Sequence, residues 1–170
     1  MLGDPDAGVA ISPDGNQIAY VPQTRDGQRQ IYLRQLNQLE GKPVPGTEGA
    51  THPVFSPDGK WLAFVGDSGP LLKVALSGGT PQLLYDYTKL GKGWYLSHTW
   101  TPSGDALISG TDSGLLRVSA AGGEPDVVTR VVQGVELCHA YPQILPGGKA
   151  VLFTVLRSRQ PLNSGFSISV

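Results

Sequence analysis

Short apolar segments alternate along the whole chain with polar turns that are rich in glycine and proline. One tight turn recurs four times, and its prolines, at positions 13, 57, 102 and 146, lie 44, 45 and 44 residues apart. A period in this range is typical of an array of like structural units. The sequence therefore predicts four repeats. Their turns are Ser12-Pro13-Asp14-Gly15, Ser56-Pro57-Asp58-Gly59, Thr101-Pro102-Ser103-Gly104 and Leu145-Pro146-Gly147-Gly148.

Each of these turns is predicted to join two antiparallel strands. Proline fixes φ at about −65° in the second position of a type I turn, and aspartate or serine beside it bonds nearby backbone groups. Glycine then adopts the positive φ that completes a hairpin with a bulge. Apolar segments flank every copy: 9–11, 54–55, 99–100 and 143–144 before the turns, and 17–20, 61–65, 106–108 and 150–155 after them.

Two further strands follow the hairpin in the first three repeats. The third strand carries one basic residue in an apolar frame, which is typical of a half-buried strand. A second turn, such as Ser77-Gly78-Gly79-Thr80-Pro81, then leads to a short fourth strand. The predicted third strands are 31–36, 71–76 and 115–120, and the fourth strands lie at 41–44, 82–85 and 126–129.

The second strand of each repeat is apolar at consecutive positions. In a sheet with one face in water, apolar and polar residues alternate along the strand. Both faces of each sheet are therefore expected to be covered by neighbouring sheets. The 23 glycines and 14 prolines also exclude a helical repeat of similar length. The predicted fold class is all-β, a β-propeller of four-stranded antiparallel blades.

The repeats are expected to fill the chain as a single propeller domain, residues 1–170. The predicted blades span approximately 9–53, 54–98, 99–142 and 143–170, and the last is incomplete because only a third strand, at 166–170, follows its hairpin. The chain thus holds about 3.8 repeats, which makes it a partial propeller or a small four-bladed one.

The turn and the strand after it resemble the TolB-like propeller repeat, in which an apolar strand and Ser-Pro-Asp-Gly precede Lys-Trp-Leu-Ala-Phe. Residues 54–65 match this pattern closely and residues 9–20 match it well. Residues 99–108 and 143–155 are degenerate copies without the turn aspartate. The resemblance implies a propeller related to periplasmic TolB, to sensor regions of bacterial serine/threonine kinases and to the propellers of prolyl-oligopeptidase-like enzymes. The Gly-Gly-x-Pro turns are most similar to those of the kinase-attached type.

An array of this length leaves the apolar faces of its end blades open, and such faces mark interfaces or aggregation hazards. Three solutions remain open. Two chains pair by a two-fold axis or stack their end blades, the chain closes alone as a four-bladed ring, or it is a fragment of something longer. Self-association through the end blades, as a homodimer, is the favoured expectation, with another protein as the alternative partner.

The bulk composition narrows the function classes. Net charge is −1 and the basic residues are scattered, so no nucleic-acid partner is expected. No apolar run approaches the roughly 20 residues of a spanning helix, so no membrane insertion is expected. A single Cys138 excludes an internal disulfide and a thiolate metal cage. Residues 1–8 lack a signal-peptide pattern, although the resembling families are often periplasmic or extracytoplasmic.

Three residues occupy nearly the same repeat position and form one candidate site. His52, His98 and Tyr141 lie five, four and five residues before the turn prolines, where the innermost strand begins. They are expected either to ring one mouth of the central channel and bind a ligand, or only to start their strands. Two histidines without a nearby carboxylate pair make a poor metal site, so no metal or cofactor is expected.

The long connection at 85–97 is the stronger candidate for binding. It carries the predicted contact residues Tyr87, Lys89, Trp94 and Tyr95, and aromatic loops on a rigid scaffold often bind partners. The alternative is that its aromatic residues pack between blades. Cys138 and His139 are adjacent and, on a strand, point to opposite faces, which disfavours a nucleophilic pair.

The function expected from these features is a non-catalytic protein-interaction or ligand-sensing module. No Gly-x-Ser-x-Gly elbow and no kinase motif occurs in the sequence. The alternatives are an accessory propeller or fragment of a prolyl-oligopeptidase-like hydrolase, and a propeller enzyme with its site in the channel.

Overall fold

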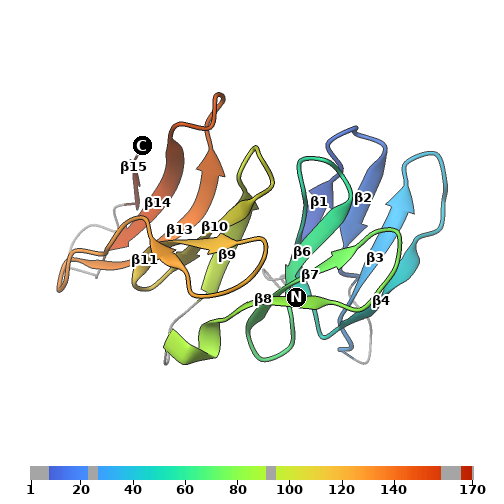
Figure 1. The fold of residues 1–170 in the computed structure, drawn as a ribbon, viewed down its shortest axis with the longest axis horizontal. Coiled ribbons are helices and arrows are strands. Elements are labelled where there is room, and N and C mark those ends of the chain that lie inside the picture. Colours follow the sequence, from blue (N-terminus) through green and yellow to red (C-terminus); the bar gives the residue numbers. More distant parts are fainter. Residues whose placement is uncertain (1–7, 23–26, 91–94, 158–165, 170) are drawn as a thin grey trace. The chain divides into compact units, whose positions relative to one another are not determined.

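The computed structural model describes residues 8–22, 27–90, 95–157 and 166–169, and within them it forms four antiparallel sheets (Figure 1). Contacts divide the chain into two compact units, Met1–Asp86 and Tyr87–Val170, which are treated one at a time below. The described residues contain no α-helix, only a short 3₁₀ helix, η1 (Tyr87–Leu90). None of the described helices has the length and apolar character needed to span a bilayer.

The first unit contains two four-stranded sheets whose strands follow one another in chain order. The first sheet has the order β1-β2-β3-β4, and the second has the order β5-β6-β7-β8. The strands are β1 (Val9–Ile11), β2 (Gln17–Tyr20), β3 (Gln30–Gln35), β4 (Lys42–Glu48), β5 (Thr51–Phe55), β6 (Trp61–Val65), β7 (Pro70–Ala75) and β8 (Gln82–Asp86).

The second unit repeats the plan with one four-stranded and one three-stranded sheet. The third sheet is ordered β12-β11-β10-β9, and the fourth is ordered β13-β14-β15. The predicted all-β fold and its up-and-down sheets are confirmed. The strands are β9 (Tyr95–Trp100), β10 (Ala106–Thr111), β11 (Gly114–Ser119), β12 (Asp126–Val127), β13 (Glu136–Ile144), β14 (Val151–Arg157) and β15 (Phe166–Ser169).

All four turns have the hairpin geometry that their sequences predict. In each, the last glycine donates its backbone N–H to the carbonyl of the first turn residue, over 2.9 Å in the first three repeats and 3.0 Å in the fourth. These glycines have φ between 68° and 72°, a conformation that other residues adopt only with strain. The degenerate turns therefore fold like the well-matched ones. They end at Gly15, Gly59, Gly104 and Gly148.

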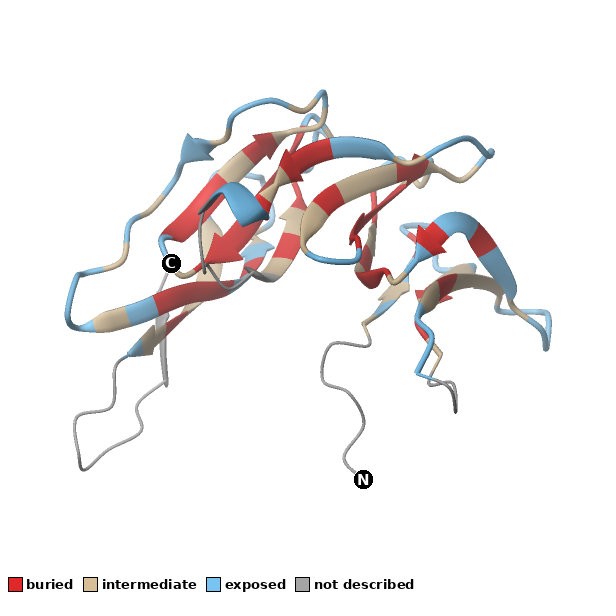
Figure 2. Cartoon of the chain, turned by 90° about the horizontal axis from the view of Figure 1, so that it is seen from below, coloured by how far each residue is buried: buried red, intermediate tan, exposed pale blue. Residues whose placement is uncertain are grey.

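The two sheets of the first unit pack face to face around one apolar core. Ala19, Val21 and Ile31 of the first sheet meet Phe55 and Leu62 of the second in a cluster of buried residues. In Figure 2, the buried residues lie mainly on the strands, whereas the loops between them are mostly exposed. The strand β10, for example, is buried at all six positions.

The same two contacts join neighbouring sheets in both units. The turn glycine of the later repeat lies against the turn proline of the earlier one, Gly59 against Pro13 and Gly148 against Pro102. The residue five positions before the turn proline makes the second contact: Gly8 packs against His52 and Pro53. In the second unit, Ser97 Oγ accepts a hydrogen bond from the Tyr141 backbone N–H over 2.7 Å. Neighbouring sheets therefore contact one another through equivalent positions of the repeat in both units.

Candidate functional site

His52 and Tyr141 share an unusual backbone conformation. Both have positive φ, 53° and 52°, and each precedes a proline at a register shift between the first two strands of its sheet. Tyr141 is 63% exposed, whereas His98, one position later in its repeat, sits in regular register opposite Ser109 and is only 6% exposed. Positive φ at bulky residues is uncommon and is often associated with functional sites.

The three residues of the predicted channel ring fall in two different units. His52 belongs to the first unit, while His98 and Tyr141 belong to the second. In the second unit, Tyr141 approaches the strand of His98 through its hydrogen bond to Ser97. The ring itself stays a prediction.

The connection at 85–97 places its candidate residues in different environments. Tyr87 begins η1 and is buried, whereas Lys89 is exposed and lies 3.9 Å from the Glu124 carboxylate. Tyr95 opens β9 opposite Thr111. Trp94 lies outside the described residues. A binding role for this connection stays a prediction, and Lys89 is an exposed charged residue within it.

Exposed apolar side chains are concentrated in one stretch of the chain that the sequence pattern did not single out. Of the 11 exposed large hydrophobic residues among the described positions, six lie between residues 127 and 141, at 42% to 63% exposure. They follow β12, the connector 128–135 and the first half of β13. We call this set the apolar connector surface. Its members are Val127, Val128, Val132, Val135, Leu137 and Tyr141.

A partly buried hydrogen-bond network holds the connector against β13. Thr129 Oγ1 lies 2.6 Å from His139 Nδ1 and accepts a bond from the Leu115 N–H over 2.9 Å. His139 Nε2 lies 3.2 Å from Glu136 Oε2, which also accepts the Val132 N–H over 2.7 Å. The connector is therefore tied to β13 near its start, through the Thr129 side chain, and at its middle, through the Val132 N–H.

Electrostatics within this network favour an ionised Glu136. The Val132 N–H bond lowers the pKa of the Glu136 carboxyl below its usual value, and the His139 bond adds to this, against the opposing effect of burial. A carboxylate that accepts two bonds is favoured in its charged form. The connector is therefore held by a hydrogen bond to the negatively charged carboxylate of Glu136.

The adjacent thiol takes no part in this network. Cys138 is opposite Leu156 in the sheet and His139 is opposite Val155. Burial raises the pKa of the Cys138 thiol, which disfavours the reactive thiolate. Both ring nitrogens of His139 are within bonding distance of other groups, Thr129 and Glu136. A cysteine–histidine nucleophile is therefore not assembled here.

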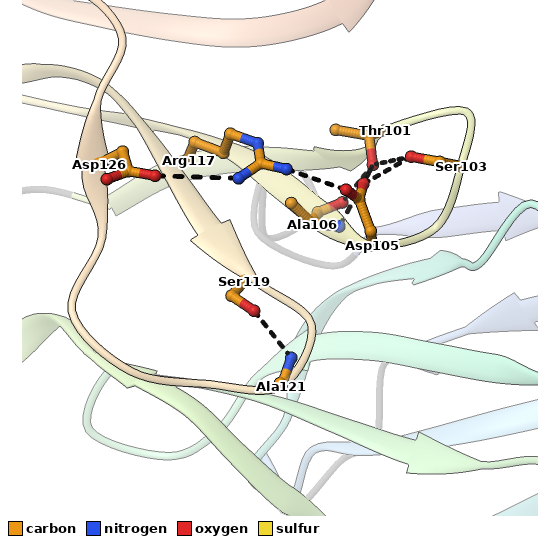
Figure 3. Close-up of polar contacts among 8 residues, drawn as sticks. All are labelled: Thr101, Ser103, Asp105, Ala106, Arg117, Ser119, Ala121 and Asp126. Carbon is orange, nitrogen blue, oxygen red and sulfur yellow. Dashed lines mark hydrogen bonds and ion pairs between the residues drawn. The ribbon is translucent and has the colours of Figure 1, made fainter.

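In the third repeat a carboxylate outside the turn replaces the missing turn aspartate (Figure 3). Asp105 Oδ1 accepts bonds from Thr101 Oγ1 over 2.7 Å and from Ser103 Oγ over 2.5 Å. Its Oδ2 accepts the Arg117 guanidinium over 3.0 Å, and the other side of that guanidinium lies 3.8 Å from Asp126. These charges link the turn between β9 and β10 with β11 and β12, which gives the cluster a structural role.

The described residues also contain surface hollows in the first unit. One of about 510 Å³ runs along β3, β4 and the end of β7, and is lined by amide and charged groups such as Gln35 and Lys42. No three His, Cys, Asp or Glu side chains within the described parts of the chain are arranged to hold a metal ion.

Sequence reasoning missed the apolar connector surface because its residues look like an ordinary strand. The segment 126–129 was expected to be a fourth strand, but β12 ends at Val127 and only two residues pair with β11. One signal was present: valines recur at 127, 128, 131, 132 and 135, in a stretch where no repeat partner for a strand is expected.

Comparisons with known proteins place this geometry among propellers. No family model matches the chain. A curated relative, "Uncharacterized peptidase YuxL" of Bacillus subtilis, is 32% identical over 107 residues, which are 57% of this chain and 16% of that protein.

Three solved structures share the fold at low identity. A putative TolB from Agrobacterium tumefaciens matches 91% of this chain and 60% of its own (TM-score 0.73, 21% identity). TolB from Acinetobacter baumannii matches 95% of this chain and 40% of its own (TM-score 0.71, 23% identity). Oligogalacturonate lyase from Vibrio parahaemolyticus matches 91% of this chain and 46% of its own (TM-score 0.68, 16% identity).

The chain spans 16% of the length of the curated relative and 40% to 60% of these three structures. The matches include proteins named as enzymes, so they leave the question of catalysis open. What they show is the architecture: this chain, with its four antiparallel sheets, shares its fold with the TolB proteins over 91% and 95% of its length. The resemblance seen in the repeats is thereby confirmed, and the chain has the TolB-like β-propeller fold.

Proposed function

We propose that this chain is a non-catalytic protein-recognition module that binds its partner through the apolar connector surface. The observation that carries the proposal is the concentration of exposed Val, Leu and Tyr side chains between residues 127 and 141. Apolar and aromatic side chains are favoured in the buried centre of protein interfaces, where charged residues are depleted. A small polar substrate would gain little from such a surface.

The rigidity of the connector supports the same proposal. The bonds from Thr129 and Val132 to His139 and Glu136 hold the connector near its start and at its middle. A surface that is already ordered loses less conformational entropy when it binds. Lys89, exposed in the same unit, would belong to a polar rim.

Site-specific photo-crosslinking tests this function. A photoreactive amino acid at Val132, which is 54% exposed, is expected to capture a discrete protein in the source cells. The same group at Leu39, which is 94% exposed on a loop of the other unit, is the matched control. The captured protein is then purified, and its affinity for the unmodified chain and for Val132→Asp is measured by calorimetry.

The expected result is binding that Val132→Asp weakens by about 30-fold, the factor for an interface hot spot of about 2 kcal/mol, and that Leu39→Asp leaves unchanged. Equal weakening by both variants, or capture at both positions alike, would contradict recognition through this surface. Turnover of peptide substrates by the purified chain, lost in His139→Asn, would contradict the non-catalytic assignment.

A second candidate function is favoured by the match to the peptidase of Bacillus subtilis. Under it, the chain is an accessory propeller that accompanies a hydrolase domain and controls access to it. The apolar connector surface would then contact that domain. A hydrolase domain in the same or a neighbouring reading frame, captured from Val132, would favour this candidate over recognition of an unrelated protein.

A further inference from the structure

The hollow of about 510 Å³ in the first unit has a polar lining that the proposed recognition surface does not use. It is lined by β3 and β4 of the first sheet and by the end of β7 in the second, and both sheets belong to one compact unit. Cavities of a few hundred cubic ångströms are the usual size of sites for small ligands. We call this hollow the amide cavity, because two paired glutamines, Gln17 and Gln35, line it.

Strand register brings these two glutamines to the same face of the first sheet. Gln17 of β2 is directly opposite Gln35 of β3, and two positions further along β2, Ala19 is opposite Leu33. Ala19 and Leu33 pack on the core that the first sheet shares with the second. Alternate residues of a strand share a face, so the two glutamine side chains also point toward the second sheet. Both glutamines are half-buried.

Among the described residues, neither glutamine amide has a hydrogen-bond partner. Gln17 donates its N–H to Ser12 Oγ over 2.9 Å, and the Gln35 carbonyl accepts the Gln38 N–H over 3.0 Å, but on both glutamines these bonds use backbone atoms. A primary amide carries an acceptor oxygen and two N–H donors. The pair therefore presents free donors and acceptors to the cavity.

The second and third repeats carry no such amide pair. The same two positions, four residues after the turn proline and directly opposite in the register, hold Trp61 and Ala75 in the second repeat. They hold Ala106 and Ser119 in the third. Sheets of this repeat therefore form without an amide at either position, so folding does not by itself require two of them here.

Apolar and charged groups complete the lining. Leu33 and Leu76 are half-buried, so apolar surface lies beside the amides. Glu40 and Lys42 are exposed and supply one charge of each sign. Arg34 borders the cavity, but it alternates with Leu33 along β3, so its side chain starts from the opposite face. None of the lining residues is aromatic, so a sugar ring would find no aromatic ring to stack on.

We propose that the amide cavity binds a short extended peptide that carries an apolar side chain. A peptide group has one N–H donor and one C=O acceptor, and a glutamine amide offers the complementary acceptor and donor side by side. Two amides on directly opposite residues, with Cβ atoms about 5 Å apart, can bond two polar groups of one peptide backbone. The apolar side chain of the peptide would then contact Leu33 and Leu76. This site lies in the other unit from the apolar connector surface.

Titration with blocked peptides tests the proposal. The probes are acetyl-Gly-Xaa-Gly-amides with Leu, Ile, Val, Met or Phe in the middle, which carry no terminal charges. In NMR spectra of isotope-labelled protein, the side-chain amide signals of Gln17 and Gln35 are expected to shift with at least one probe. The signal of Gln82, exposed at the start of β8 and outside the cavity, is expected to stay in place.

Matched variants test whether the amides bind the peptide backbone. Gln35→Leu keeps the approximate size of the side chain but removes its polar groups, so it is expected to raise the dissociation constant of the best probe about 10-fold. Gln17→Leu is expected to do the same. Gln82→Leu makes this exchange outside the cavity and is expected to leave the affinity unchanged. A probe with an N-methylated middle residue lacks one N–H donor and is expected to bind about 10-fold more weakly.

Several results would overturn the proposal. No shift with any probe at millimolar concentration would refute peptide binding. Shifts with the disaccharides maltose or cellobiose, but not with the peptides, would assign the cavity to saccharides. Equal weakening by Gln82→Leu, or undiminished binding of the N-methylated probe, would show that the amides do not bind the peptide backbone. Melting curves check that each variant folds, and Gln35→Ala replaces Gln35→Leu if the latter does not.

Discussion

The aspartates of the two well-matched turns hold their loops closed with short hydrogen bonds. Asp58 Oδ1 accepts Ser56 Oγ–H over 2.6 Å and the Lys60 N–H over 3.1 Å. The Ser56 bond is the main reason that the pKa of Asp58 lies below its usual value of 3.8. The same bond from Ser12 lowers the pKa of Asp14. In both turns the ionised carboxylate is the form that stabilises the fold.

The lowered pKa values predict a loss of stability in acid. A carboxyl whose folded pKa lies below its unfolded pKa stabilises the fold above the unfolded value, and the contribution disappears as pH falls through the folded value. Asp58→Asn is therefore expected to melt at a lower temperature than the wild type above about pH 5. Below about pH 4 the difference between the two melting temperatures is expected to become smaller. Melting curves measured from neutral pH to pH 2 check this.

Two further variants control the acid prediction. Asp14→Asn is expected to behave like Asp58→Asn, since its turn has the same bonds. Glu40→Gln changes an exposed carboxyl in a loop, and its gap from wild type is expected to stay small throughout. A gap for Asp58→Asn that does not depend on pH would show that its carboxylate bonds are not coupled to folding.

Backbone strain at His52 gives a second prediction at the same scale. A residue with a Cβ at φ 53° is strained, and glycine relieves that strain. His52→Gly is expected to change the free energy of unfolding by between zero and about +1 kcal/mol, whereas His52→Val, which is β-branched, is expected to be destabilising. Urea unfolding measures both. If Gly and Val destabilise alike, the histidine side chain matters more than its backbone.

Turn chemistry also shows how far sequence reasoning reaches at single positions. The pattern predicted all four hairpins, including the degenerate ones, because proline and glycine constrain φ locally. It treated the third turn as having lost its carboxylate, yet Asp105 supplies one from two residues beyond Ser103. Only the folded geometry shows that a carboxylate displaced along the chain reaches the same hydroxyl.

At the scale of elements, the connector 128–135 depends on one hydroxyl. Thr129 Oγ1 serves both His139 Nδ1 and the Leu115 N–H. Thr129→Val keeps the shape but leaves these groups without a partner, so it is expected to cost about 1–3 kcal/mol of unfolding free energy. Thermal melting measures the loss, and limited proteolysis is expected to show faster cleavage within 128–135.

A matched substitution makes the connector prediction specific. Thr88→Val removes a hydroxyl from an exposed position of η1 in the same unit, and it is expected to leave cleavage within the connector unchanged. Slow cleavage of Thr129→Val, equal to wild type, would mean that the Glu136–Val132 bond alone fixes the connector.

Strand positions could be predicted more closely than the candidate site. The third strands were predicted to within one residue at each end, for example 71–76 where β7 is Pro70–Ala75. There the apolar segment and the turn residues that flank it indicate the same strand ends. The innermost strand of the first repeat lies at Val9–Ile11 as predicted, but those of the other three repeats begin earlier than expected; β13, for example, starts at Glu136, not near Gln143. The bulges at His52 and Tyr141 explain part of this extension, since a bulge carries a strand past an interrupted register.

For the whole molecule, the sequence predicted the repeat and the need for covered blade faces, because both follow from periodicity and apolar pattern. It could not predict which surface binds. The apolar connector surface arises where the fourth strand of one repeat is cut short and the chain continues as a fixed loop. That outcome depends on a partly buried network of Thr129, His139 and Glu136, whose members are separated along the chain.

The contacts between neighbouring sheets predict how far the destabilising effect of one substitution extends through the chain. In repeat proteins each unit is stabilised by itself and by its nearest neighbours. Ser56 is 2% exposed, and its hydroxyl accepts the Trp61 N–H over 2.9 Å, so Ser56→Ala is expected to cost about 1–2 kcal/mol. Hydrogen exchange is expected to accelerate most in β5–β8, then in β1–β4, and least in β10 and β14. Ser77→Ala, at an exposed turn, is the control. Equal acceleration in all sheets would contradict nearest-neighbour coupling and would show that the chain unfolds as one cooperative body.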